Sequence, residues 1–263
     1  MNGPSMRFLG HSTARLELAG RVVLTDPVLT RRVGGLSRVV PLPDPAQWRD
    51  TDLVLISHLH GDHLHLPSLR LIGRHVRVVV PRGAGAWLRQ RGFTRVEELD
   101  VDGEFTDGDL HVRATRALHS GHRWGPRLTH GPQSEAMGYL LTTPDSSVYF
   151  AGDTDLFPDM AKLAPVDVAL LPVWGWGPNL GPGHLDPVRA ALAVGLLRPR
   201  VAVPVHWGTL VVPGLSRSAR MSRLLVDPPL EFAAGVLAAG HDTEVVVAQP
   251  GEAVPFPAPK DHS

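Results

Sequence analysis

The chain has 263 residues, enough for one large domain or two modest ones with a full hydrophobic core. Lys+Arg and Asp+Glu number 26 each, so no net charge draws the chain to nucleic acid or anionic lipid. Cysteine is absent, which excludes a disulfide framework and thiolate metal ligands. No signal-peptide pattern and no apolar run near the roughly 20 residues of a membrane span occur, so we expect a cytoplasmic protein without stable membrane insertion.

Short runs of β-forming residues recur along the chain, with helical segments between some of them. We expect strands at 14–18, 21–25, 53–57, 76–80, 110–115, 137–142, 147–151, 168–171, 201–205 and 244–247. Helices are expected at 67–74, 83–91, 188–197 and 229–239. No low-complexity linker divides the chain, so we predict one layered α/β (α+β) domain over residues 1–251 and a disordered, proline-rich tail at 252–263.

The densest group of polar residues follows the apolar run 53–56. His58, His60, Asp62 and His63 fall within six positions there, and the intervening glycine can turn the chain. His58 and His60 are two apart, so an extended backbone points both side chains to the same side. Imidazole and carboxylate groups are ligands for zinc and similar ions. Four of them in one loop exceed the needs of one structural ion and predict a two-metal site.

Three further polar residues stand where other apolar runs end. His119 follows 112–118, Asp153 follows 148–152, and His206 follows 201–205. Taken alone, each histidine would be an ordinary hydrogen-bonded loop residue, and Asp153 a turn or N-cap residue. Their shared position at strand ends, where α/β proteins place ligands, favours a common site instead.

The segment His58-Leu59-His60-Gly61-Asp62-His63 resembles the signature of the metallo-β-lactamase superfamily, with His119, Asp153 and His206 following in the expected order. Residues 9–13, 24–27, 150–154 and 206–209 resemble the branch that contains N-acyl-phosphatidylethanolamine-hydrolysing phospholipase D and ascorbate-6-phosphate lactonase. The resemblance extends from about residue 8 to about residue 251. It implies a four-layer αββα sandwich with the metals at one edge.

The resemblance also implies a ligand set for two divalent ions. The first ion would be held by His58, His60 and His119, the second by Asp62, His63 and His206, with Asp153 bridging them. Zinc is the expected metal, although a set of histidines and aspartates also accepts manganese or iron.

Two such ions can share a water and make it acidic enough to give hydroxide at neutral pH, which attacks a carbonyl carbon or a phosphorus. No protein nucleophile is then needed. We expect Asp62 to orient the attacking oxygen and His184 to protonate the leaving group, unless His184 only caps or packs. Asp26 and His11 are expected to orient ligands, although His11 could lie in the core of the first hairpin.

The loop 172–179 lies between Asp153 and His184 in the sequence, so it should overhang the site. Trp174 and Trp176 in this loop, together with His184, are candidates for contacting the substrate, and packing under the loop is the alternative for the tryptophans. Arg123, Trp124 and Arg127 could meet an anionic group, but a solvated loop is the favoured interpretation.

The leading hypothesis is a metal-dependent hydrolase of a phosphodiester or lactone/ester bond in a small metabolite. Its nearer rival is a phospholipase D-type hydrolase of N-acylated phospholipids, for which no membrane-docking element is evident beyond the tryptophan loop. A β-lactamase is disfavoured because no export signal is present, and RNA processing because the charge is balanced. A non-catalytic metal-binding protein is the alternative from another class. The expected partner is a small molecule, not nucleic acid, and a homo-oligomer stays open.

Overall fold

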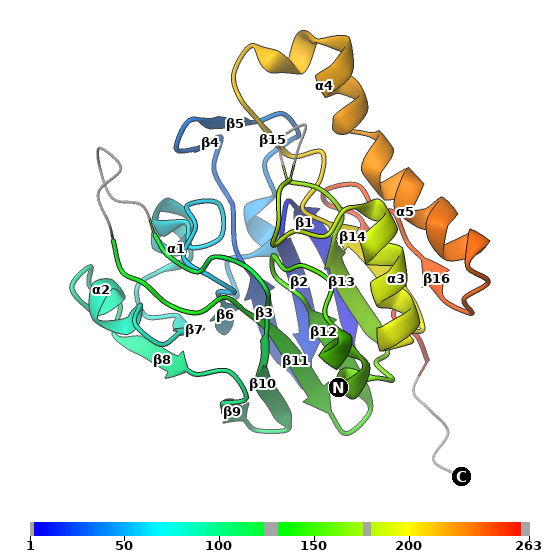
Figure 1. Ribbon diagram of the computed structural model, residues 1–263. Coiled ribbons are helices and arrows are strands. Elements are labelled where there is room, and N and C mark those ends of the chain that lie inside the picture. The colour runs from blue at the N-terminus through cyan, green and yellow to red at the C-terminus, as the bar shows by residue number, and fades with distance from the viewer. Residues whose placement is uncertain (1–2, 124–130, 176–179, 259–263) are drawn as a thin grey trace.

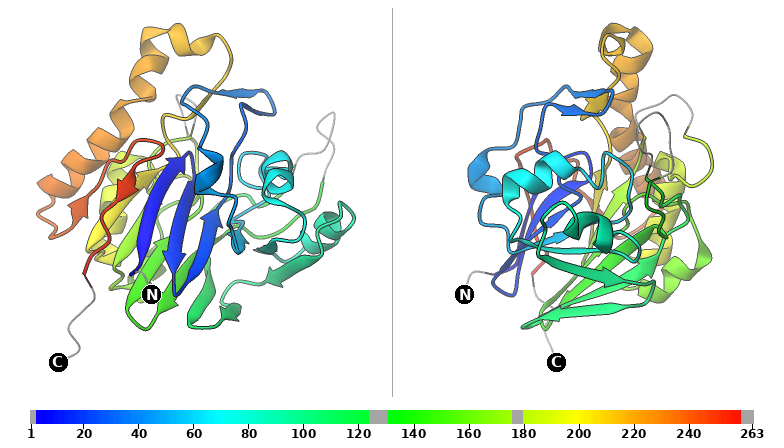
Figure 2. Two further views of the ribbon diagram at one scale, coloured as in Figure 1. Left: turned by 180° about the vertical axis from the view of Figure 1, so that it is seen from behind. Right: turned by 90° about the vertical axis from the view of Figure 1, so that its left-hand side faces the viewer.

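The computed structural model describes residues 3–123, 131–175 and 180–258 (Figure 1). Two seven-stranded sheets face each other, and helices cover their outer faces (Figure 2). In spatial order, the first sheet contains β17 (Ala253–Val254), β1 (Ser5–Gly10), β2 (Thr13–Leu18), β3 (Arg21–Thr25), β6 (Leu53–Leu55), β7 (Arg77–Pro81) and β8 (Arg95–Leu99). The second contains β16 (Glu244–Val245), β14 (Val201–Val205), β13 (Val168–Pro172), β12 (Ser146–Phe150), β11 (Met137–Thr143), β10 (Leu110–Arg116) and β9 (Glu104–Asp107).

The outer layers differ in the helices that form them. Helices α1 (Leu66–Ile72) and α2 (Gly85–Arg89) pack on the first sheet and share one hydrophobic cluster with its strands. Helices α3 (Pro187–Leu197) and α5 (Asp227–Ala238) pack on the second sheet. These layers confirm the predicted α/β class and the αββα arrangement.

Residues 53–56 show why the predicted strands are continuous apolar runs. Leu53 and Leu55 belong to the core between the two sheets, whereas Val54 and Ile56 belong to the cluster under the helices. Successive side chains of a strand point to opposite faces, so a strand buried on both faces needs apolar residues at every position. The strand itself ends at Leu55, and the buried Ile56 and Ser57 lead from it to His58.

Strand direction explains how distant residues meet at one edge. In the first sheet β3 and β6 are parallel, and in the second β12 and β14 are each parallel to β13. Strand β10 is antiparallel to β11, which is antiparallel to β12, so β10 runs in the same direction as β12. The residues after β10, β12 and β14 consequently lie at the same end of the second sheet. The loop after β6 lies beside them, since Nε2 of His63 is 3.4 Å from Oδ2 of Asp153.

A smaller sheet stands beside that end. It consists of β15 (Leu210–Val211), β5 (Leu36–Arg38) and β4 (Arg32–Val33), and helix α4 (Ala219–Leu224) follows β15 in the chain (Figure 1). The sequence predicted none of these elements. Their strands have two or three residues, too few for an alternating pattern to be recognised.

Other differences lie at sheet edges. The sequence Arg-Val-Glu-Glu-Leu of β8 was not predicted as a strand because charged residues occupy most of it. The sheet also continues beyond the predicted domain end, since β17 pairs with β1 and buries Val254. The last residues of the predicted tail, 259–263, lie outside the described part of the chain.

Candidate metal centre

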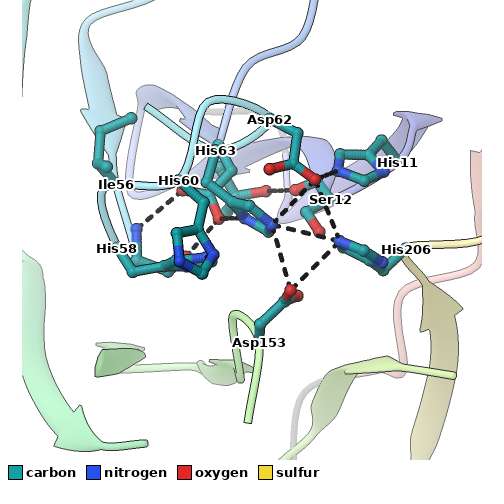
Figure 3. A network of polar contacts seen from close by, with 12 residues as sticks. His11, Ser12, Ile56, His58, His60, Asp62, His63, Asp153 and His206 are labelled. Carbon is teal, nitrogen blue, oxygen red and sulfur yellow. Dashed lines mark hydrogen bonds and ion pairs between the residues drawn. The ribbon is translucent and has the colours of Figure 1, made fainter. Parts of the chain in front are cut away.

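The candidate ligands converge from both sheets (Figure 3). They occupy the loops that follow β6, β10, β12 and β14, and the backbone at two of these turns has a left-handed conformation: Gly152 has φ 61° and His206 has φ 63°. A side chain at position 152 would collide with Ser57, so a glycine there lets Asp153 approach the first sheet. The structure brings together His58, His60, Asp62, His63, His119, Asp153 and His206.

Three imidazoles form one group of potential ligands. The Nδ1 atom of His60 lies 3.0 Å from Nε2 of His58 and 3.2 Å from Nε2 of His119. All three ligand nitrogens lie within 4.8 Å of one another. Nitrogen lone pairs that face each other this closely repel unless a proton or a cation lies between them, so the group fits a divalent ion.

A second group contains Asp62, His63 and His206. The Nε2 atoms of His63 and His206 are 3.2 Å apart, and Oδ2 of Asp62 lies 3.9 Å and 3.7 Å from them, respectively. Oδ2 of Asp153 lies 3.4 Å from Nε2 of His63, 3.3 Å from that of His206 and 4.0 Å from that of His119. Asp153 thus contacts both groups, which is the place that a bridging ligand needs.

Backbone carbonyls orient the rings of two candidate ligands. Nδ1 of His119 donates a hydrogen bond of 2.7 Å to the carbonyl of Gly183, and Nδ1 of His206 donates to the carbonyl of Trp174. Each bond places the ring proton on Nδ1 and leaves the Nε2 lone pair facing the site.

Asp26 orients the rings of two more candidate ligands. Its carboxylate accepts hydrogen bonds from Nδ1 of His63 at 2.6 Å and from the hydroxyl and the amide nitrogen of Ser57. Since the Ser57 hydroxyl donates to Asp26, its oxygen is free to accept a hydrogen bond from Nδ1 of His58, 2.9 Å away. Asp26 therefore contacts His63 directly and His58 through Ser57.

The electrostatics of the centre keep most of its imidazoles neutral and its carboxylates ionised. Burial lowers the pKa of His58 well below its usual range and, with a neighbouring imidazole, lowers that of His60 to about 4. Burial would raise the pKa of Asp62 and Asp153, but the surrounding histidines hold both well below their usual range. Burial also opposes protonation of His63, yet nearby carboxylates raise its pKa. A cation would replace that proton.

Two buried polar atoms in or beside this ligand set have no hydrogen-bond partner among the described residues. They are Oδ1 of Asp153 and Nδ1 of His184. His184 has a ligand nitrogen within 4.8 Å of those of His119 and Asp153. Because a buried polar atom without a partner is costly, these atoms support a cation or a bound substrate as the missing partner.

His11 is buried, but at the edge of the centre. Its Nε2 lies 3.2 Å from Oδ2 of Asp62, and its ring centroid lies 4.0 Å from that of His206. Its backbone accepts a hydrogen bond from the amide of His206 and donates one to the hydroxyl of Thr209. This position agrees with an orienting role toward Asp62, which stays a prediction.

Of the two tryptophans expected to contact the substrate, Trp174 lies in the described part of the chain. The side chain of Trp174 is 5% exposed and belongs to the main hydrophobic core, so the packing alternative describes it better. Its backbone carbonyl contacts the centre by accepting a hydrogen bond from Nδ1 of His206. Trp176 lies outside the described residues, as do Trp124 and Arg127.

Arg123 is not part of a solvated loop. Its guanidinium donates hydrogen bonds to the carbonyls of Leu59 and Leu64, at either end of the histidine-rich loop, and lies over the ring of Trp87. Burial lowers its pKa. The sequence offers no signal for this clamp or for Ser57, because both depend on contacts between loops that are distant in the chain.

The comparisons with known proteins agree with this geometry. A model of the β-lactamase superfamily domain matches residues 21–207, which include the candidate ligands. The chain belongs to the metallo-β-lactamase superfamily. Within this superfamily it is similar to a UPF0173 metal-dependent hydrolase of Methanopyrus kandleri, with 33% identity over 93% of this chain and 96% of the relative. A UPF0173 metal-dependent hydrolase of Pyrococcus horikoshii is 31% identical over 94% of this chain and 97% of its own.

Solved structures show the same superfamily fold. Igni18, a metallo hydrolase from Ignicoccus hospitalis, superimposes with a TM-score of 0.70 at 27% identity and covers 95% of this chain and 97% of its own. CmlA, a diiron β-hydroxylase from Streptomyces venezuelae, superimposes with a TM-score of 0.71 at 20% identity and covers 97% of this chain and 54% of its own. The second likeness concerns the fold alone. The chain is a metal-dependent hydrolase of this superfamily, and the specific branch suggested by its flanking motifs stays a hypothesis.

Proposed function

We propose that this hydrolase uses two divalent ions, with zinc as the expected metal, to cleave a phosphodiester or a lactone/ester bond of a small metabolite. The observation that carries the proposal is the pair of ligand groups on either side of Asp153. His58, His60 and His119 form one group, and Asp62, His63 and His206 form the other, with His11 also within 4.8 Å of these three. A pair of bound ions would supply an acidified water as nucleophile and would stabilise the negative charge that develops during attack.

The residues of the chain position this chemistry. Asp62 Oδ2 points into the second group and is held by Nε2 of His11 at 3.2 Å. It can therefore bind an ion and accept a proton from the attacking water. Asp26, Ser57 and the carbonyls of Gly183 and Trp174 keep the imidazoles in the required orientation.

We assign protonation of the leaving group to His184. Its Nδ1 is buried without a described partner, and its ring centroid lies 4.6 Å from that of His119, on the side of the first ligand group. A general acid in this position donates its proton to the oxygen of the departing group. If His184 were a metal ligand instead, its loss would reduce the metal content.

The leaving-group dependence of a His184→Gln variant tests this assignment. On phosphodiesters or esters with an alkoxide leaving group, kcat should fall by about 10²–10⁴-fold, since an alkoxide needs a proton to depart. On the corresponding nitrophenyl substrates kcat should change little, and the metal content should equal that of the wild type. Equal losses on both substrate classes, or a loss of metal, would contradict the assignment.

A substrate panel separates the remaining alternatives. It should contain small phosphodiesters, lactones and N-acylated phospholipids, with turnover measured on the protein loaded with zinc, manganese or iron. Iron is included because CmlA, which has the same fold, is a diiron protein. Turnover of the small substrates supports our proposal, and exclusive turnover of the phospholipid favours the phospholipase D-type rival. Tight metal binding without turnover would favour a metal-binding protein. A cytoplasmic location and a homo-oligomer stay expectations from the sequence.

A further inference from the structure

Basic residues are distributed unevenly in this chain of zero net charge. Residues 27–43 and 207–226 contain no aspartate or glutamate, and we call the two segments together the basic lobe. All 26 acidic residues of the chain lie outside the basic lobe, whereas only 20 of the 26 basic residues do. The arginines of the lobe are Arg31, Arg32, Arg38, Arg217, Arg220 and Arg223. The balanced composition therefore conceals a positive region.

The two segments form one structural unit beside the metal centre. The first begins directly after Asp26 and the second directly after His206, so both leave the sandwich at the site. Strand β5 of the first segment pairs with β15 of the second, and Val39 donates a backbone hydrogen bond to Thr209. Val28, Val33 and Leu210 form a small hydrophobic cluster of their own. The small sheet and α4 stand at one end of the molecule (Figures 1 and 2).

The arginines of this lobe have different roles. Arg38 is partly buried and donates to the carbonyls of Leu9, Val28 and Pro41, so it holds the lobe on the sandwich. Arg31, Arg32, Arg220 and Arg223 are exposed and form no ion pair with the described acidic residues. Their charges are available to a partner.

Aliphatic side chains are exposed among these arginines. Val39, Leu42, Val212, Leu215 and Val226 are between 37% and 55% exposed. Exposed aliphatic residues with basic residues and without acidic ones are typical of surfaces that lie in the headgroup region of anionic membranes. Single-stranded nucleic acid prefers aromatic stacking platforms, and the described exposed large hydrophobic residues of the lobe are all aliphatic.

We propose that the basic lobe docks the protein on an anionic lipid surface, with the metal centre next to that surface. Docking would be peripheral, because none of the helices in the described part of the chain has the length and apolarity needed to cross a bilayer. The arginines would contact lipid phosphates, and the aliphatic residues would enter the headgroup region. The proposal goes beyond hydrolysis, and its test needs no turnover, so either proposal can fail without the other.

Vesicle flotation of the purified full-length protein tests the docking. Vesicles with about 30% phosphatidylglycerol in phosphatidylcholine should bind the protein at low salt, and pure phosphatidylcholine should bind it far more weakly. Each arginine near such a surface contributes about fivefold to the partition coefficient. The double variants Arg31→Gln/Arg32→Gln and Arg220→Gln/Arg223→Gln should therefore each lower the partition coefficient by about 25-fold.

A matched control removes two exposed arginines elsewhere. Arg70→Gln/Arg95→Gln, on α1 and β8, should bind the anionic vesicles as the wild type does. Equal binding by all variants, or equal binding to both vesicle types, would overturn the proposal. So would binding of duplex DNA without binding of vesicles. Sedimentation velocity tests a different occupant of this surface. If the lobe variants dissociate a dimer without changing vesicle binding, a second copy of the chain occupies the surface and the docking proposal is wrong.

Discussion

Asp26 shows how much of the centre depends on single residues behind the ligands. It is completely buried, and its two oxygens accept from the Nδ1 of His63 and from both donors of Ser57. The convergence of the candidate ligands was predictable from the sequence, because they are concentrated in one loop and at strand ends. The residues that orient them were less so. Asp26 was expected there, but Ser57 and Arg123 act through tertiary contacts that a single sequence does not encode locally.

An Asp26→Asn variant should bind metal more weakly while it keeps the fold. The amide nitrogen of asparagine cannot accept the hydrogen bonds that one of the carboxylate oxygens accepts, so His63 or Ser57 loses its partner. The affinity for at least one zinc ion should fall by about 10–100-fold. Competition with a chromogenic chelator measures this, and Asp145→Asn, at an exposed turn, is the control. Equal zinc affinity in both variants would contradict the role of Asp26 in orienting the candidate ligands.

At the scale of elements, α2 and β8 stabilise each other through Glu98. The N-cap position of α2, Ala84, offers no side-chain hydrogen bond, and Glu98 of β8 accepts from the amides of Gly83 and Gly85 instead. Arg89 of the same helix donates to its other oxygen at 3.1 Å. Glu98 is thus one of the charged residues because of which β8 was not predicted as a strand, and it caps a helix. Such capping between elements has no signature in local propensity.

The contribution of Glu98 should depend on pH. Burial would raise its pKa, but the amides of Gly85 and Gly83 and the guanidinium of Arg89 lower it below the ordinary value. A lowered folded-state pKa means that the stabilisation is present above the unfolded pKa and is lost as the pH falls through the folded pKa. Glu98→Gln should cost about 1 kcal/mol near pH 7, the usual size of a capping interaction, and much less near pH 3.

Thermal or urea unfolding of the wild type, Glu98→Gln and Glu97→Gln across this pH range measures the effect. Glu97 is the exposed neighbour on the same strand. The difference in unfolding free energy between Glu97→Gln and the wild type should not depend on pH in this way. A stability difference for Glu98→Gln that stays constant with pH would contradict the assigned cap.

For the whole molecule, the sequence predicts most strands of the sandwich, but it does not predict which distant segments pair with one another. The runs at 21–25 and 201–205 coincide with β3 and β14. Every residue of β14 is buried, and a strand buried on both faces is continuously apolar. The sequence does not show that β17 joins β1 across the chain, nor that residues 27–43 pair with 207–226. These contacts join distant segments, and they create the basic lobe that composition alone conceals.

The metal content of the purified full-length protein tests the central claim most directly. Elemental analysis after removal of loosely bound ions should give about two divalent ions per chain. His60→Ala should lose at least one of them, because His60 lies between His58 and His119 in the first group. His111→Ala, an exposed histidine on β10, should keep both. A wild-type protein without tightly bound transition metal, or a His60→Ala variant with the same content as His111→Ala, would contradict the binuclear centre.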